Sequence, residues 1–296
     1  MIRKILRWGL ILLCVSVVVL LGAVGWVGSE RALKPQYYHY KWSLSSFPNM
    51  HAEQIKVKST TGVELTGRFF AGSGRSLVVL ANGYGDTQDQ VLPFADFLHK
   101  AGFNVLTFNM RGRGDSGGEY VTLGVLEQLD LISVLNYAAK RPEVDPRRIG
   151  VLGISMGGAT GILAAAQDPR IKAIVDDCGF SDAPGVIAAS FEHFIHLPAF
   201  PFAPLTVWIA SERANIDVAS ARPMDVIGRI SPRPVLIIHG LADYVVPVDN
   251  SQRNFNSAHQ PKELWLVPGA GHGQAHTVAK AEYERKVDVF FENALQ

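Results

Sequence analysis

The chain has 296 residues, of which 48% are hydrophobic and 19% are charged. This composition excludes a disordered or collagen-like chain and is sufficient for a sizeable core. The 28 basic and 27 acidic residues give a formal net charge of +1, which removes the broad electrostatic case for a nucleic-acid-binding protein. Two cysteines, Cys14 and Cys178, are too few for a disulfide framework, so we expect no structural disulfide.

The amino-terminal segment is the first predicted element. Residues 8–28 read WGLILLCVSVVVLLGAVGWVG without a charge. As a helix with a rise of about 1.5 Å per residue, this run reaches about 31 Å, which is the thickness of a bilayer core. Three basic residues among the first seven precede the run, whereas Glu30 and Arg31 closely follow it. By the positive-inside rule, the amino terminus then stays in the cytoplasm and the rest of the chain is extracytoplasmic.

We therefore predict a single-pass membrane anchor over residues 1–30. A cleaved signal peptide is the alternative, because small residues at 23–25 are typical of a cleavage site, and the remaining chain would then be secreted. A buried core helix is a third interpretation. Residues 31–50 contain Tyr37, Tyr38 and other aromatic residues without a clear period, which suits a stem that lies near the membrane or packs on the following domain.

Residues 51–296 are predicted to form one α/β domain. Two strand-like runs, 54–58 and 63–70, flank a turn and indicate an antiparallel hairpin. Further apolar runs of strand length follow at 77–81, 103–108, 149–154, 171–175, 235–238 and 264–267. Helical stretches lie between or after them at 90–100, 122–139, 157–166, 251–257 and 275–295. Near-continuous apolar strands are typical of a mostly parallel sheet that is covered by helices on both faces.

One long interval interrupts this alternation. Residues 179–231 separate two predicted strands and are rich in proline and aromatic residues, which predicts an inserted cap. The aromatic side chains either pack the cap onto the sheet or line an acyl pocket, and the sequence leaves both interpretations open.

The strongest chemical motif is RIGVLGISMGG at residues 148–158. A buried strand runs directly into Ser155 and then into an alanine-rich helix, with Gly153 and Gly157 two residues before and after the serine. This is the pattern of a nucleophile elbow, in which the neighbours of a strained serine approach too closely for a Cβ atom. The backbone N–H of Met156 would face a developing oxyanion at the helix start. An ordinary tight turn between strand and helix is the alternative.

A nucleophilic serine needs a base and a residue that orients the base, and the fold order predicts serine, then acid, then histidine. Asp243 follows the strand PVLIIHG, and His272 lies in a loop after the strand ELWLVPG. We predict Asp243 as the acid and His272 as the base. Three other residues could replace them, namely His276 as base and Asp176 and Asp177 as acids, whereas His239 at a strand end is interpreted as a packed residue.

A second oxyanion donor is expected in the loop after residues 77–81, which reads ANGYGD. We predict the backbone N–H of Tyr84 for this role, because a turn with two glycines leaves backbone donors accessible. An ordinary loop between strand and helix is again the alternative.

The motifs ANGYGD, NMRGRGDSGG, GISMGG, HGLADYVVP and GAGHG resemble those of the α/β-hydrolase superfamily. Within it, the chain is similar to the membrane-anchored serine hydrolases of the Bem46- and YqkD-like group, over residues 54–296. The resemblance implies Ser155 as nucleophile, Asp243 as acid and His272 as base. In the family, the loop after this strand usually begins with His-Gly, whereas in this chain it begins with Asn82-Gly83. We expect this departure to affect substrate preference more than activity.

These residues predict a serine esterase, lipase or thioesterase that cleaves a small-molecule or lipid acyl ester through an acyl-enzyme. A serine aminopeptidase or other peptidase of this fold is one alternative, and a membrane-anchored binding module without activity is another. The mechanism needs no metal and no organic cofactor. The glycines 112, 114 and 117 match a dinucleotide fingerprint, but the next strand leads to Ser155 and not to the acidic residue that binds a ribose.

Overall fold

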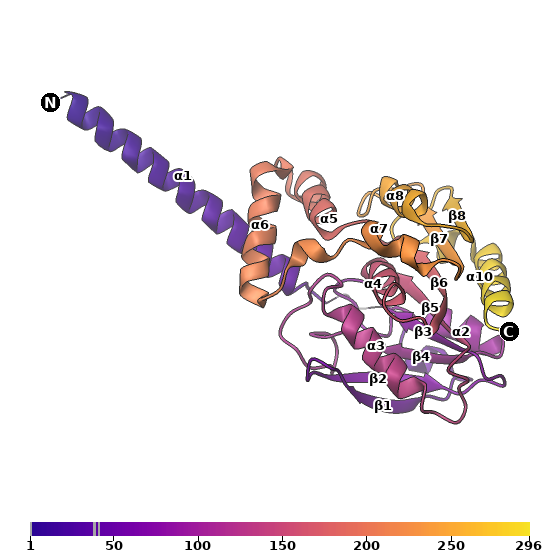
Figure 1. The fold of residues 1–296 in the computed structure, drawn as a ribbon. Coiled ribbons are helices and arrows are strands. Elements are labelled where there is room, and N and C mark those ends of the chain that lie inside the picture. Colours follow the sequence, from indigo (N-terminus) through magenta and orange to yellow (C-terminus); the bar gives the residue numbers. More distant parts are fainter. Residues whose placement is uncertain (1, 38–39, 41) are drawn as a thin grey trace.

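An eight-stranded sheet organises the chain, which we describe from a computed structural model covering residues 2–37, 40 and 42–296 (Figure 1). Met1 of the predicted anchor and Tyr38 of the predicted stem lie outside the described residues. The strands are ordered β1-β2-β4-β3-β5-β6-β7-β8. β2 pairs antiparallel with β1 and with β4, and all the other pairs are parallel. The prediction of a mostly parallel sheet is confirmed.

The strand bounds agree closely with the apolar runs of the sequence. The strands are β1 Glu53–Lys58, β2 Glu64–Phe70, β3 Leu77–Ala81, β4 Asn104–Phe108, β5 Ile149–Ile154, β6 Ile171–Asp177, β7 Val235–Gly240 and β8 Lys262–Val267. β3, β4 and β5 are buried along their whole length, as expected for strands covered on both faces.

Helices cover both faces of this sheet. The longer ones are α1 Ile2–Leu33, α2 Leu92–Lys100, α3 Glu127–Ala138, α4 Met156–Ala165, α5 Ala183–Ser190, α6 Ala199–Ala214, α8 Asp249–Ser257 and α10 Lys280–Ala294. Short ones are α7 Pro223–Val226, α9 Ala275–Val278, η1 Leu44–Ser46, η2 Phe191–Ile195, η3 Val218–Ser220 and η4 Ile227–Ile230. Two predicted bounds are wrong. The stretch 275–295 is interrupted at Ala279, and α3 starts late because the Glu127 carboxylate accepts hydrogen bonds from Thr122 and Gly124 within a turn.

The alternation of side chains along β3 divides the core into two layers. Leu77 and Val79 belong to the cluster that contains residues of α3 and α4. Val78 and Leu80 belong to the opposite cluster, which contains residues of α2 and α10. A sheet that is buried in this way on both faces exposes its loops mainly at the strand ends, where side chains can reach a substrate.

The segment between β6 and β7, residues 178–234, contains α5, α6 and α7 and is called the insert below. Its aromatic residues fall into two groups. Phe180 and Phe191 are buried, and the Phe191 ring stacks on Phe202 with the centroids 6.0 Å apart. Phe200 and Trp208 are exposed. The buried group supports packing of the insert onto the domain, whereas the exposed group requires a different explanation.

Helix α1 projects away from the domain and contacts α6 near its carboxyl end (Figure 1). Residues 3–20 are exposed, so the core-helix interpretation does not hold for them. Within the described residues, α1 is the helix that is long and apolar enough to cross a membrane, and these properties suit a membrane anchor and a signal sequence alike. From the last residue of α1 onward, the chain packs on the domain: the Leu33 carbonyl accepts the Val121 N–H, and the Trp42 indole donates to the Asp89 carbonyl.

Candidate active site

Ser155 lies in a strained turn between β5 and α4. Its φ is 56° and its ψ is −119°, which is an uncommon backbone conformation for a residue other than glycine. The Ser155 N–H donates to the Asp177 carbonyl at 2.7 Å and fixes the turn against β6. A Cβ atom at Gly157 would lie 2.1 Å from the Ala81 carbonyl oxygen, and one at Gly153 would lie 2.2 Å from the Gly157 backbone. Both positions therefore require glycine, as the elbow pattern predicts.

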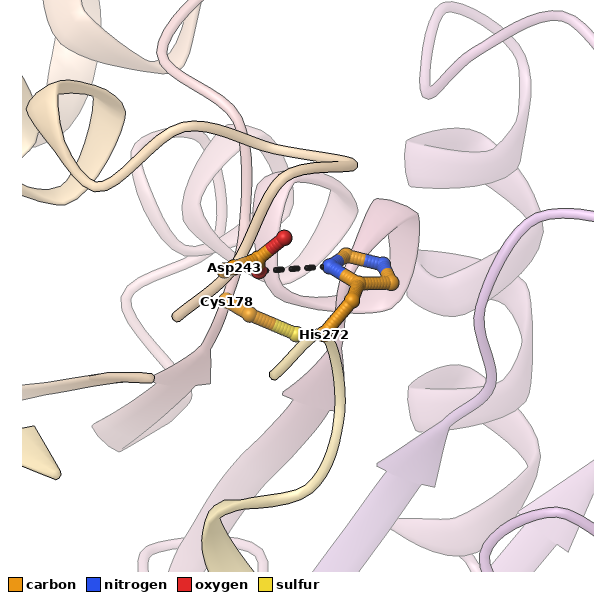
Figure 2. A group of neighbouring side chains, drawn as sticks. All are labelled: Cys178, Asp243 and His272. Atoms are coloured by element: carbon orange, nitrogen blue, oxygen red, sulfur yellow. Dashed lines mark hydrogen bonds and ion pairs between the residues drawn. The ribbon is translucent and has the colours of Figure 1, made fainter. Parts of the chain in front are cut away.

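The structure brings Ser155, His272 and Asp243 into one hydrogen-bonded chain. His272 Nε2 lies 2.8 Å from Ser155 Oγ, and His272 Nδ1 lies 2.7 Å from Asp243 Oδ2. Figure 2 shows the contact between Asp243 and the imidazole as a dashed line. With a proton on Nδ1, the imidazole donates to Asp243 and accepts the Ser155 hydroxyl proton at Nε2. The three residues therefore have the geometry of a nucleophile, a base and an orienting carboxylate.

The Asp243 carboxylate is held from several sides. Its Oδ1 accepts the backbone N–H groups of Val245 and Val246, each at 2.9 Å. Burial by itself raises the pKa of Asp243, but hydrogen bonds from His239 and His272 outweigh burial and lower the pKa to about 2. The carboxylate is therefore ionised at neutral pH and can stabilise a positively charged His272.

His239 is a second contact of Asp243 whose role the sequence did not reveal. Its Nε2 donates to the Val246 carbonyl at 2.8 Å and lies 3.3 Å from Asp243 Oδ2. Burial opposes a charge on His239, yet its hydrogen bonds to Asp243 and Val246 raise its pKa overall. The spacing of four residues between His239 and Asp243 was the available signal. It was weak because the end of a buried strand is an ordinary position for a packed histidine.

The other candidate residues have different partners. Tyr283 donates to Asp177 Oδ2 at 2.9 Å, and the Gly179 N–H donates to Asp176 Oδ1 at 3.0 Å. Burial raises the pKa of Asp176 to about 7 and that of Asp177 to about 6. His276 Nε2 pairs with a carboxylate oxygen of Glu284 at 3.0 Å. These hydrogen bonds tie Asp176, Asp177 and His276 to residues outside the Ser155 chain.

The predicted oxyanion donors follow two adjacent strands, β5 and β3. Met156 is the first residue of α4, a position whose N–H has no acceptor within the helix. Tyr84 follows β3, which is the parallel neighbour of β5, so its loop and the elbow lie at the same edge of the sheet. The Tyr84 hydroxyl donates to the Arg31 carbonyl at the end of α1. The loop that carries Tyr84 is thus connected to the amino-terminal helix.

Asn82 braces the same loop. Its Nδ2 donates to the Gly83 carbonyl at 3.1 Å and to the Asp86 carbonyl at 2.9 Å. The Gln90 side chain accepts the Gly83 N–H at 2.6 Å and donates to the Asp86 carboxylate, also at 2.6 Å. Burial raises the pKa of Asp86 to about 6. The loop conformation therefore depends on a network of buried amide and carboxyl groups.

Cys178 lies beside the acid and the base (Figure 2). Its sulfur and the potential ligand atoms of Asp243 and His272 lie within 4.8 Å of one another. Burial raises the pKa of the Cys178 thiol well above its usual value, which keeps the thiol protonated. A metal ion at this position would have to displace the hydrogen bond between His272 and Asp243. Cys178, Asp243 and His272 are therefore poorly suited to bind a metal ion.

The glycine-rich loop after β4 forms a closed turn. The Gly112 N–H donates to the Gly117 carbonyl at 2.8 Å. The preceding Arg111 is buried and makes hydrogen bonds of 2.7 Å to both carboxylate oxygens of Asp130 on α3. These contacts indicate a structural role for the loop.

The fold and the Ser155 elbow define an α/β hydrolase. The chain belongs to the prolyl oligopeptidase family, whose sequence model matches residues 94–296. It is 26% identical over 253 residues to the Bacillus subtilis protein YqkD, covering 84% of this chain and 82% of that protein. It is 27% identical over 248 residues to YfhR of Escherichia coli O157:H7, covering 81% of this chain and 80% of that protein.

A solved structure gives the same result for the fold. The Pyrococcus furiosus esterase Pf2001 is 26% identical and superposes with a TM-score of 0.72, covering 88% of this chain and 100% of that chain. The sequence-based assignment to the α/β hydrolases and the similarity to YqkD are confirmed. Family and structural relatives together support a serine hydrolase in general.

Proposed function

We propose that the protein is a serine hydrolase that cleaves carboxylic ester or thioester bonds through an acyl-enzyme. The observation that carries this proposal is the hydrogen-bonded chain from Ser155 through His272 to Asp243. The similarity to Pf2001, which is described as an esterase, favours esters as the substrate class.

In the proposed mechanism, Ser155 Oγ attacks the ester carbonyl carbon while His272 Nε2 takes the hydroxyl proton. Asp243 stabilises the resulting imidazolium, and the backbone N–H groups of Met156 and Tyr84 donate to the oxyanion. His272 then protonates the leaving alkoxide, the C–O bond breaks and the acyl group remains on Ser155. A water molecule, deprotonated by His272, hydrolyses this ester and regenerates the serine.

Peptide hydrolysis is the second candidate, and the match to the prolyl oligopeptidase family favours it. The same serine, base and oxyanion donors can cleave an amide when His272 protonates the leaving amine. The two candidates differ in the substrate that the insert and the surrounding loops accept.

We further propose that α1 anchors the enzyme in a membrane, with the domain on the extracytoplasmic side. The exposure of residues 3–20 and the basic residues before the apolar run support this proposal. A carboxyl-terminal reporter that is active only outside the cytoplasm tests the orientation. Blotting of the mature protein for loss of mass tests whether α1 is removed.

The deciding experiment is fluorophosphonate labelling of the full chain beside Ser155→Ala and His272→Ala. We expect both substitutions to abolish labelling and the hydrolysis of p-nitrophenyl esters of increasing chain length. His193→Ala, which removes an exposed imidazole of the insert, is the matched control and should keep both activities. Aminoacyl and peptidyl anilides tested in parallel would identify a peptidase. A folded wild type that neither labels nor hydrolyses these substrates would instead support a binding module.

A further inference from the structure

Helix α6 of the insert packs closely against the carboxyl-terminal part of α1 (Figure 1). A Cβ atom at Gly25 would lie 2.8 Å from side-chain atoms of Leu205 and Ile209. One at Gly28 would lie 2.4 Å from Thr206 Oγ1. Glycine at both positions therefore allows the two helices to approach more closely than larger residues would permit.

Arg213 near the end of α6 adds polar contacts to this packing. Its guanidinium donates to Ser29 Oγ at 2.8 Å and pairs with the Glu30 carboxylate. The same group lies 4.2 Å from the centroid of the Trp26 ring. The position of α6 along α1 is thus fixed by packing, an ion pair and a cation–π contact.

The opposite side of α6 carries an exposed apolar face. Pro204 and Trp208 lie one helical turn apart, and Phe200 precedes them at the start of α6, where its backbone angles are not helical; all three side chains are exposed. Phe200 is 79% exposed and Trp208 is 60% exposed. Large aromatic side chains with this exposure are typical of a surface that contacts another apolar phase or partner.

The length of α1 fixes the depth of this face. The uncharged run of residues 8–28 is about 31 Å long at about 1.5 Å per residue, close to the thickness of a bilayer core. The contacts of α6 at Gly25 and Gly28 lie at the carboxyl-terminal end of this run, within about 5 Å of its last residue. α6 therefore crosses α1 at the level where a membrane surface begins.

We propose that the face formed by Phe200, Pro204 and Trp208, called the α6 face, docks on the lipid bilayer at the carboxyl-terminal end of α1. The partner is the interfacial layer of the membrane, where the Trp208 ring can bury its apolar part and keep its indole N–H hydrated while the Phe200 ring is buried. This inference rests on the proposed membrane anchor and is independent of the reaction at Ser155. The domain is then held in a fixed orientation on the membrane and does not move freely on a flexible stem.

Site-specific fluorescence in single-copy lipid nanodiscs tests the proposal. Cys14 of the full chain, which is exposed on α1, is labelled with an NBD maleimide and reports whether α1 is embedded. In a Cys14→Ala background, the label is placed separately at Phe200→Cys and at Trp208→Cys. Val289→Cys is the matched control. Val289 is 44% exposed and belongs to α10, a helix that lies far from α1 in Figure 1. Unfolding curves check that each variant folds. If one of the two test variants does not fold, the other still tests the proposal.

Lipids with a nitroxide near the headgroup should quench the labels at positions 200 and 208 at least about two-fold more than the label at position 289. If Cys14 is quenched by deep nitroxides but positions 200 and 208 behave like position 289, the docking proposal is wrong although the anchor is correct. If Cys14 is not quenched either, the anchor itself is wrong. Shielding of position 208 that appears only in multi-copy discs, without quenching by lipid, would identify self-association and overturn the proposal.

Discussion

The carboxyl edge of the sheet and the contact between α1 and α6 hold their residues in different ways. At the sheet edge, the backbone itself determines the geometry, since Ser155 is fixed by an N–H bond to Asp177 and by the lack of space around Gly157. At the helix contact, the side chains of Arg213, Glu30 and Trp26 add to the close packing at Gly25 and Gly28. We infer that the first region tolerates almost no substitution, whereas the second can be loosened by one residue without loss of the fold.

The largest expected effect is that of Asp243→Asn. The amide presents a donor to His272 Nδ1, so the imidazole takes the tautomer that cannot accept the Ser155 proton. We expect ester hydrolysis to fall by about ten-thousand-fold, as measured by kcat/KM. Asp176→Asn makes the same chemical change on β6, where the Asp176 carboxylate accepts hydrogen bonds from Gly179 and Asn254 and none from His272. Comparable losses in both variants would contradict the assigned role of Asp243.

Asp176→Asn should nevertheless change how stability depends on pH. The folded protein keeps a proton on Asp176 up to about pH 7, whereas the unfolded chain releases it near its usual pKa of 3.8. Folding therefore takes up a proton in this interval, and the free energy of unfolding falls as the pH rises from about 4 to about 7. The substitution should remove up to about 1.4 kcal/mol per pH unit from this slope.

Urea unfolding in detergent at pH 4.5, 6 and 8 would measure the change in slope. The neighbouring Asp177 has a pKa raised to about 6 and keeps its own contribution in the Asp176→Asn variant. We therefore expect a reduced slope and not a flat profile. A slope identical to that of the wild type would show that Asp176 is already ionised in the folded protein at low pH.

Gly157→Ala tests whether the backbone determines the site. The new Cβ atom would lie 2.1 Å from the Ala81 carbonyl oxygen, so β3 and α4 must move apart. We expect a loss of about 1–3 kcal/mol in the free energy of unfolding and a lower kcat from displacement of the Met156 N–H. Gly117→Ala is the control, because its nearest contact is 3.5 Å away. Equal melting temperatures for the two variants would refute the steric argument.

The same contrast explains what could be predicted from the sequence. The Ser155 elbow and the strands of the sheet are local patterns, in which apolar runs and flanking glycines specify the conformation of their own segment. Asp243 and His272 follow from their place after strands whose ends meet at one edge. Both the fold and the grouping of these side chains can therefore be predicted from the sequence.

The helix contact was not accessible in this way. Gly25 and Gly28 are indistinguishable from the other small residues of an apolar run, and Arg213 is 184 residues from the Ser29 side chain that it contacts. Such a pairing depends on the tertiary arrangement, which no local period encodes. The break at Ala279 was missed for a related reason, since apolar spacing continues through residues that do not keep helical backbone angles.

Arg213→Gln should release the helix contact with the smallest of these effects. The change removes the ion pair with Glu30 and the contact with the Trp26 ring, but leaves the glycine packing in place. We expect amide hydrogen exchange in residues 199–214, measured in nanodiscs, to become about ten-fold faster, which corresponds to about 1.4 kcal/mol of local stability.

Arg229→Gln provides the comparison, because Arg229 is an exposed arginine of the same insert at the η4 turn, away from the α1 contact. Exchange in α6 should be unchanged in this variant. If Arg213→Gln also leaves exchange in α6 unchanged, packing at Gly25 and Gly28 alone holds the helices together. Both regions would then depend on the close approach of two backbone segments. They would differ only in that the glycines of the Ser155 elbow can be recognised from the sequence, whereas Gly25 and Gly28 cannot.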